Sequence, residues 1–292
     1  MSKVAAPSWK SVNLSSGAAE RLTNPFPAIA EAAAAGETAE IFDDIRATVG
    51  VWVVNLVWRH LATIDGALPW AWSAVKPLYA QGMVDRAAVT FRARMTLPVL
   101  TSLAGEQPPS VDAVLSSYDH SNTINLFALG ALTAWLHGEA AAQGVPKAGP
   151  RLPAPDLPLP KLALEEDAPA ETWALVLRLN RFGDPRQVIL ASMYRHLAHA
   201  PDFLHKVEDA LGPVEADGSL GRSIEANKRM AYEQAKLLAC AIVADRPLRA
   251  SEIETSVSAF VDAAIGKMVT ICRAIRVARG SVSMHNGAVP SP

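Results

Sequence analysis

Length, composition and charge exclude several classes of protein. The chain has 292 residues, half of them hydrophobic, with 27 Lys and Arg against 29 Asp and Glu and a formal charge of −2. This balance offers no basic surface to a nucleic acid or an anionic membrane. Residues 1–22 lack the hydrophobic segment of a secretory signal, and apolar runs such as 126–136 reach about half of the roughly 20 residues that a membrane span needs. We expect a soluble cytoplasmic protein.

The first half of the chain predicts helices and no strands. Residues 1–36 are expected to form an N-terminal arm, which ends in a proline-containing stretch and an alanine run. Helical periodicity then begins, because Phe42, Ile45 and Val49 share one face. Glycines and prolines divide the following residues into short helical segments, and no alternating strand pattern occurs. Residues 37–142 are therefore predicted to be a first helical repeat.

A proline-rich stretch separates this region from the second half. Seven prolines lie between Pro146 and Pro169, and such a density favours extended conformation over helix. Residues 143–169 are predicted to be a semi-rigid linker, 170–280 a second helical repeat and 281–292 a disordered tail. The last helix is expected to begin with a capping box formed by Ser251 and Glu254.

An internal repeat supports this division. The phrase Trp58-Arg59-His60-Leu61-Ala62 returns at 194–198 as Tyr194-Arg195-His196-Leu197-Ala198, 136 positions later (194 minus 58). Four identities within otherwise dissimilar helices indicate a duplicated and fused unit. We therefore predict an all-α protein of two fused helical repeats, related by a pseudo-twofold axis, with its site at their interface.

Common catalytic and metal-binding signatures are missing. The sequence has no Gly-rich phosphate loop, no HExxH, no GxSxG and no Cys-based metal spacing. His196 and His199 are three residues apart, but no third ligand lies nearby in sequence, so solvent-facing or helix-capping histidines are the expected reading. No metal is predicted.

Polar residues are unusually dense over 116–125, directly before a strongly apolar helix. On a helix, Tyr118, Asn122 and Asn125 align at i, i+4 and i+7, and Asp119 flanks this stripe. Polar groups carried into a core need partners or a ligand, so this stripe is a candidate wall of a site. The alternative is a helix start capped by Asp119 or Ser121. A second candidate is Ser192, whose hydroxyl in an apolar helix could equally bond to a carbonyl one turn earlier.

At these residues the chain resembles the group I 2-haloacid dehalogenases. The resemblance runs through most of the chain and is clearest at the segments 42–46, 59–72 and 87–94, the polar cluster, and Ala191-Ser192 with 197–201. It implies an all-α fold of two fused repeats with the site between them and neither metal nor organic cofactor. It also implies a hydrolase in which an aspartate activates the water that displaces halide from C2 of a short haloacid, with inversion.

The resemblance also assigns site residues and exposes one departure. Asn122 matches an asparagine lining the family's site, Ala191 and Ser192 match the residues beside its catalytic aspartate, and Trp52 stands near an aromatic of the substrate pocket. Asn125 replaces an aromatic. Met193 occupies the place of the aspartate, and a thioether cannot take a proton at any relevant pH.

Two functions remain open after this departure. One is a dehalogenase-like hydrolase with altered or lost activity, in which Asp119 supplies the missing carboxylate and Tyr118 and Asn125 join the substrate-binding wall. Asp119 is alternatively a cap or half of an ion pair, and Asp184 is a weaker candidate base. The other function is a non-catalytic protein that binds a small carboxylate in the same pocket. Arg59 and Arg195 are candidate carboxylate ligands or structural arginines, and a homodimer is one assembly open to the chain.

Overall fold

The structure is a computed structural model that describes residues 26–282 except 142, 143, 145, 156, 185, 187 and 188. Within these residues every regular element is a helix, which confirms the predicted all-α fold. Most of the predicted arm (1–25) and of the predicted tail (283–292) lies outside the described residues.

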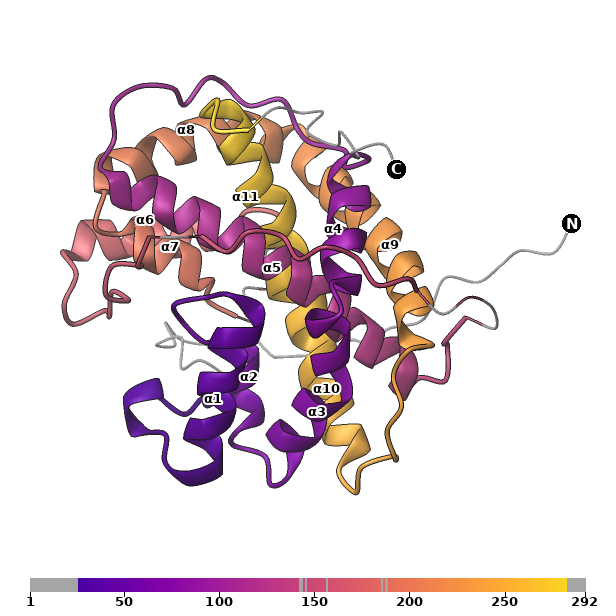
Figure 1. Ribbon diagram of the computed structural model, residues 1–292. Helices are drawn as coiled ribbons and strands as arrows, with labels where there is room; N and C mark the ends of the chain where they lie inside the picture. The colour runs from indigo at the N-terminus through magenta and orange to yellow at the C-terminus, as the bar shows by residue number, and fades with distance from the viewer. Residues whose placement is uncertain are drawn as a thin grey trace, which may run out of the picture.

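The helices occur in a similar order in the two halves (Figure 1). The first half contains η1 (Glu31–Ala33), α1 (Gly36–Val49), α2 (Leu56–Leu61), α3 (Ala67–Ala80), α4 (Met83–Arg92) and α5 (Pro109–Leu136). The second contains α6 (Ala170–Arg181), α7 (Ser192–Leu197), α8 (Pro201–Ala216), α9 (Ser219–Ala239), α10 (Ala250–Ala259), the π-helical η2 (Phe260–Ile265) and α11 (Gly266–Ala278). The repeated phrase lies on α2 and α7, which are both six residues long.

One predicted helix start is wrong. Helix α10 begins at Ala250, so Ser251 lies inside the first turn and no side chain caps the helix. Ala250 is buried in the core of the first half, and this packing starts the helix one residue before the expected cap allows. Glu254 instead lies 3.0 Å from Nε2 of His137.

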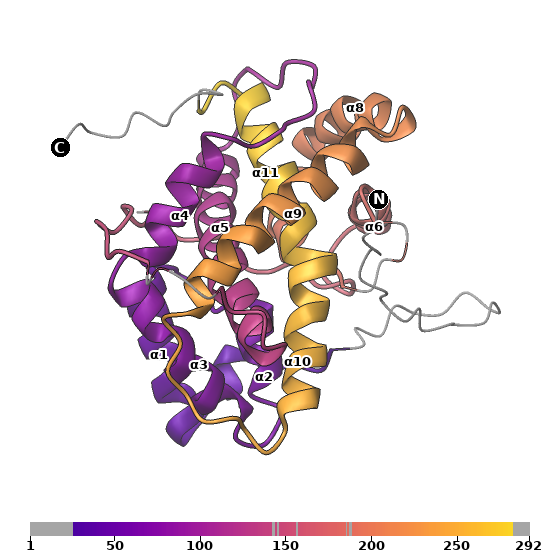
Figure 2. The ribbon, with the colours of Figure 1, turned by 90° about the vertical axis from the view of Figure 1, so that its right-hand side faces the viewer.

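The two halves share their hydrophobic cores. The first turns of α5 contribute Val111 and Val114 to a core built mostly from the second half. The start of α10 contributes Ile253 and Val257 to a core built mostly from the first. In Figure 2, α5 lies among α4, α9 and α11 and packs against each of them. Because each half completes the core of the other, we expect them to fold as one unit.

Close packing holds the central helices together. A Cβ added at Gly130 of α5 would lie 3.1 Å from the Cβ of Ala235 of α9, so a glycine is what allows the two helices this approach. The continuous helix Ala250–Ala278 is long and apolar enough to cross a membrane by length and composition, but 72% of its most apolar window is buried inside the protein. A helix buried in this way is typical of the core of a helical protein.

The proline-rich linker is attached to both halves (Figure 1). Near its start, the amide of Leu152 donates to Oδ1 of Asp85 at 2.8 Å, and Arg151 pairs with the same carboxylate at 3.1 Å. Near its end, the carbonyl oxygens of Pro160 and Ala163 accept hydrogen bonds from side chains of α7. The linker therefore runs as a strap over the molecule and forms part of the wall described next.

Candidate functional site

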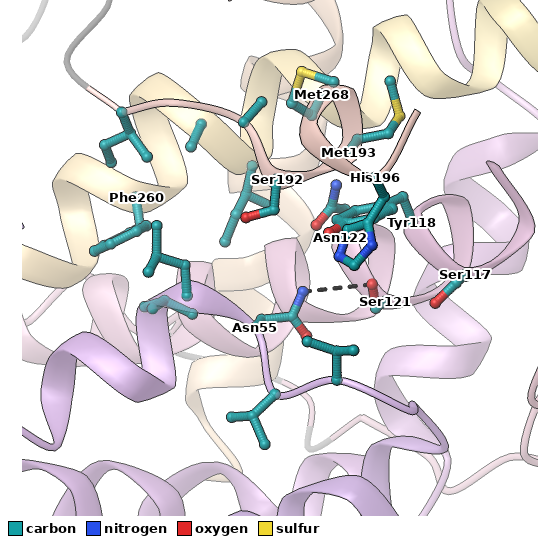
Figure 3. Close-up of a pocket in the computed structure, with 18 of the residues that line it drawn as sticks. Asn55, Ser117, Tyr118, Ser121, Asn122, Ser192, Met193, His196, Phe260 and Met268 are labelled. Carbon is teal, nitrogen blue, oxygen red and sulfur yellow. Dashed lines mark hydrogen bonds between the residues drawn. The ribbon is translucent and has the colours of Figure 1, made fainter. Parts of the chain in front are cut away.

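A cavity of about 70 Å³ lies between the two halves (Figure 3). Its walls come from the segment before α2, from α5, from the start of α7, from the linker and from η2. This volume holds a few water molecules or a ligand of a few heavy atoms. The site therefore suits a small molecule.

Five of the predicted site residues line this cavity: Tyr118, Asn122, Ala191, Ser192 and Met193. Helix α5 carries Tyr118 and Asn122 one turn apart, and α7 begins with Ser192 and Met193. Figure 3 shows Asn122 and Tyr118 opposite Ser192. The structure thus brings the polar cluster of the first half and the Ser192 segment of the second half into one place.

Asn122 presents a free amide to this cavity. The residue is 6% exposed, and among the described residues its side chain has no hydrogen-bond partner. Its neighbour Ser121 accepts a hydrogen bond of 3.4 Å from Asn55, which Figure 3 marks. A buried polar group without a partner is costly, so the Asn122 amide is available to a ligand.

Trp52 and Asn125 do not line the cavity, contrary to the prediction. Trp52 is 52% exposed, and its indole N–H donates to the carbonyl of Pro155 in the linker. Asn125 is fully buried, and its Oδ1 accepts hydrogen bonds from Trp58 at 3.1 Å and from Tyr79 at 2.7 Å. These partners satisfy the amide oxygen inside the core, so the role of Asn125 is structural.

Asp119 is also placed away from the cavity, which corrects its prediction as a replacement base. It is buried on a different face of α5, where one carboxylate oxygen contacts three guanidinium groups. The distances are 2.5 Å to Arg276, 3.3 Å to Arg273 and 3.6 Å to Arg92. The ion-pair alternative therefore describes this residue. Asp184 likewise pairs with Arg186 at 2.9 Å and does not line the cavity.

No Asp or Glu occurs among the described residues that line the cavity. Met193 lies in the wall with 1% of its surface exposed. Burial raises the pKa of Tyr118 against the opposing effects of a Ser192 hydrogen bond and of the charges of Arg195 and Arg59. The Tyr118 hydroxyl therefore stays protonated at neutral pH and acts as a donor or acceptor rather than as a base.

His196 is a cavity residue that the sequence did not identify. It is 2% exposed rather than solvent-facing, and its Nδ1 lies 2.8 Å from the carbonyl oxygen of Pro160. Because a carbonyl only accepts, Nδ1 carries the proton and Nε2 carries a lone pair. Burial lowers the pKa of His196 to about 4, so the ring is neutral at pH 7. His199 bonds instead to the carbonyl of Lys161 at 2.7 Å.

The two arginines of the repeated phrase differ in their relation to the cavity. Arg59 lines it, while Arg195 does not. Arg195 lies over the ring of Trp173, 6.0 Å from its centroid, and burial lowers its pKa. Arg59 is thus the cation best placed for a ligand carboxylate. Nothing in the sequence distinguishes the two residues, because both follow an aromatic within the same phrase.

The helical architecture and the cavity between its halves together define the fold of the haloacid dehalogenases, and comparison with known proteins supports this. Solved structures of D-2-haloacid dehalogenase superpose on the chain with a TM-score of 0.70 and cover 88% of it and 97% of their own length. They include a mutant with D-2-CPA (18% identity), an enzyme with L-LA (19%) and a further mutant (18%). No protein-family model and no curated protein sequence matches. The fold implied by the resemblance is confirmed.

Proposed function

We propose that this protein binds a short, 2-substituted monocarboxylate in the cavity between its halves. Arg59 supplies a positive charge to the carboxylate, and Tyr118, Asn122 and Ser192 supply hydrogen-bonding groups around it. The small volume favours a ligand of about the size of a three-carbon acid. Structures of D-2-haloacid dehalogenase with D-2-CPA and with L-LA support this ligand class, since they share the fold.

The observation that carries the proposal is the wall around Met193. Direct displacement of halide by water requires a positioned general base, which typically contributes roughly 10² to 10⁴ in rate. Met193 stands where the dehalogenase resemblance calls for that base, and no carboxylate lines the cavity within the described residues. Binding is therefore retained by this wall, while the aspartate-dependent hydrolysis is lost.

Two measurements on the purified protein test this proposal. The first is halide release from 2-chloropropionate and 2-bromopropionate, and the second is the melting temperature with the same acids and with propionate. We expect the acids to raise the melting temperature, as a ligand of the native state must, without halide release. Enzymatic halide release would overturn the binding function in favour of a hydrolase. An unchanged melting temperature with every acid would overturn carboxylate binding.

A further inference from the structure

The histidines of the two repeated phrases are anchored in the same way. Nδ1 of His60 lies 2.7 Å from the carbonyl oxygen of Pro27, and Nδ1 of His196 lies 2.8 Å from that of Pro160. In each case the carbonyl accepts, so Nδ1 carries the hydrogen and Nε2 presents a lone pair. Both rings are buried, at 6% and 2% exposure.

The two rings differ at Nε2. In the first half, Nε2 of His60 lies 3.1 Å from Oγ of Ser256, whose hydroxyl donates to it. In the second half, Nε2 of His196 is buried and has no partner among the described residues. A buried acceptor without a partner costs about 1–3 kcal/mol. The same ring is thus satisfied by the protein in one half and left open in the other.

The open Nε2 belongs to a residue of the cavity wall. Figure 3 shows the His196 ring beside Tyr118 and Asn122, and the Tyr118 and His196 ring centroids are 5.8 Å apart. We propose that Nε2 of His196 accepts a hydrogen bond from the ligand, so that the cavity selects a short 2-hydroxycarboxylate over its 2-halo analogue. This inference rests on the proposed carboxylate binding and names the ligand class more closely.

The chemistry of the wall favours a hydroxyl over other 2-substituents. A halogen has no hydrogen to donate, so a 2-haloacid leaves Nε2 unpaired and covered. An ammonium group has hydrogens, but it would bring a second positive charge toward Arg59 where no carboxylate among the described residues lines the cavity. A hydroxyl donates without charge. Sites built around such a hydrogen bond discriminate strongly against analogues that lack the donor.

Calorimetric titration with lactate, 2-chloropropionate, alanine and propionate at about pH 7.5, where a histidine is ordinarily neutral, tests the selection. We expect lactate to bind about tenfold more tightly than 2-chloropropionate, the ratio that corresponds to roughly 1.4 kcal/mol for a satisfied acceptor. Alanine is expected to bind no better than propionate. In His196→Asn, the amide nitrogen can take the place of Nδ1 toward Pro160 while the Nε2 acceptor is removed. The preference for lactate should then disappear.

His60→Asn is the matched control, because it makes the same change to a ring whose Nε2 is already bonded to Ser256. It should keep the preference for lactate. Equal binding of lactate and 2-chloropropionate by the wild type, or an undiminished preference in His196→Asn, would overturn the inference while carboxylate binding stands. Absence of binding by all four acids would instead overturn the proposed function itself.

A second measurement covers the case in which His196→Asn does not fold. Nitrogen NMR of the wild-type imidazoles reports on the unprotonated Nε2 directly. Saturating lactate should shift the His196 Nε2 resonance, and 2-chloropropionate should leave it close to its unliganded position. Identical responses to the two acids would contradict a hydrogen bond from the hydroxyl.

Discussion

Arg59 and Arg195 make the same hydrogen bond in the two halves: Nε of each donates over 2.9 Å to a backbone carbonyl, that of Ile29 and that of Ala163. Both acceptors lie in segments that precede the phrase and contain the prolines bonded to His60 and His196. The correspondence between the halves therefore extends beyond the five-residue phrase. Anchoring these segments is a structural reason for the phrase to occur twice, and duplication remains the prediction that accounts for it.

Replacing Arg59 should weaken carboxylate binding. We expect Arg59→Gln to raise the dissociation constant for lactate about tenfold or more, because hydrogen bonds to a charged group contribute roughly 1.5–3 kcal/mol. Arg195→Gln is the matched control, since it loses the equivalent backbone bond but no group that lines the cavity. Titration calorimetry on both variants checks this, and equal losses would argue against Arg59 as the carboxylate ligand.

Met193→Asp should restore a base to the cavity. A carboxylate there could take a proton from water, so we expect halide release from 2-chloropropionate at least about 100-fold above that of Met193→Asn. Burial raises the pKa of a carboxyl group, so the rate should increase with pH over the range in which the introduced carboxyl ionises. Halide measurements on both variants provide the comparison. Equal rates in the two would mean that position 193 cannot serve as a base here.

Asp119→Asn should destabilise the fold rather than change ligand selection. The substitution leaves Arg92, Arg273 and Arg276 around a neutral side chain, and breaking a buried ion pair costs roughly 3–5 kcal/mol. Asp112→Asn is the control, because that carboxylate pairs with Arg279 but its side chain is 47% exposed. We expect it to cost about 1 kcal/mol or less. Urea unfolding measures both, and a small loss for Asp119→Asn would contradict the ion-pair role.

His196 should make stability depend on pH between about 4 and 6.5. Its pKa is about 4 in the folded protein against an ordinary value of 6.5, so in this window the unfolded chain binds more protons than the native one. The contribution of His196 to stability is then complete above pH 6.5 and falls as the pH is lowered toward 4. The expected loss is about 2–3 kcal/mol on going from about pH 7 to about pH 4.5.

Comparison with His196→Asn isolates this contribution, because His120, whose pKa is also lowered by burial, is present in both proteins. Urea unfolding at the two ends of this pH range should show a smaller loss of stability for the variant. An equal loss in wild type and variant would mean that His196 does not carry the effect.

Local patterns in the sequence were sufficient to predict the helical fold, the strap and part of the cavity wall. Helical periodicity and proline spacing act over a few residues, so they can be read without knowing the neighbours of a helix. The dense polar cluster was a correct sign of the wall formed by Tyr118 and Asn122. The start of α10 was misplaced because core packing at Ala250 overrode the capping pattern.

The tertiary structure alone decided which polar residues meet the cavity. Asp119 and Asn122 lie within one turn of α5, yet the arginines of α11 face the first and the cavity faces the second. Likewise Ser256 occupies Nε2 of His60, while no described residue occupies that of His196, although the two phrases are the same at that position. Such differences depend on partners far away in sequence. The sequence by itself determined the helices and the methionine at position 193, and the packing of distant helices determined the site.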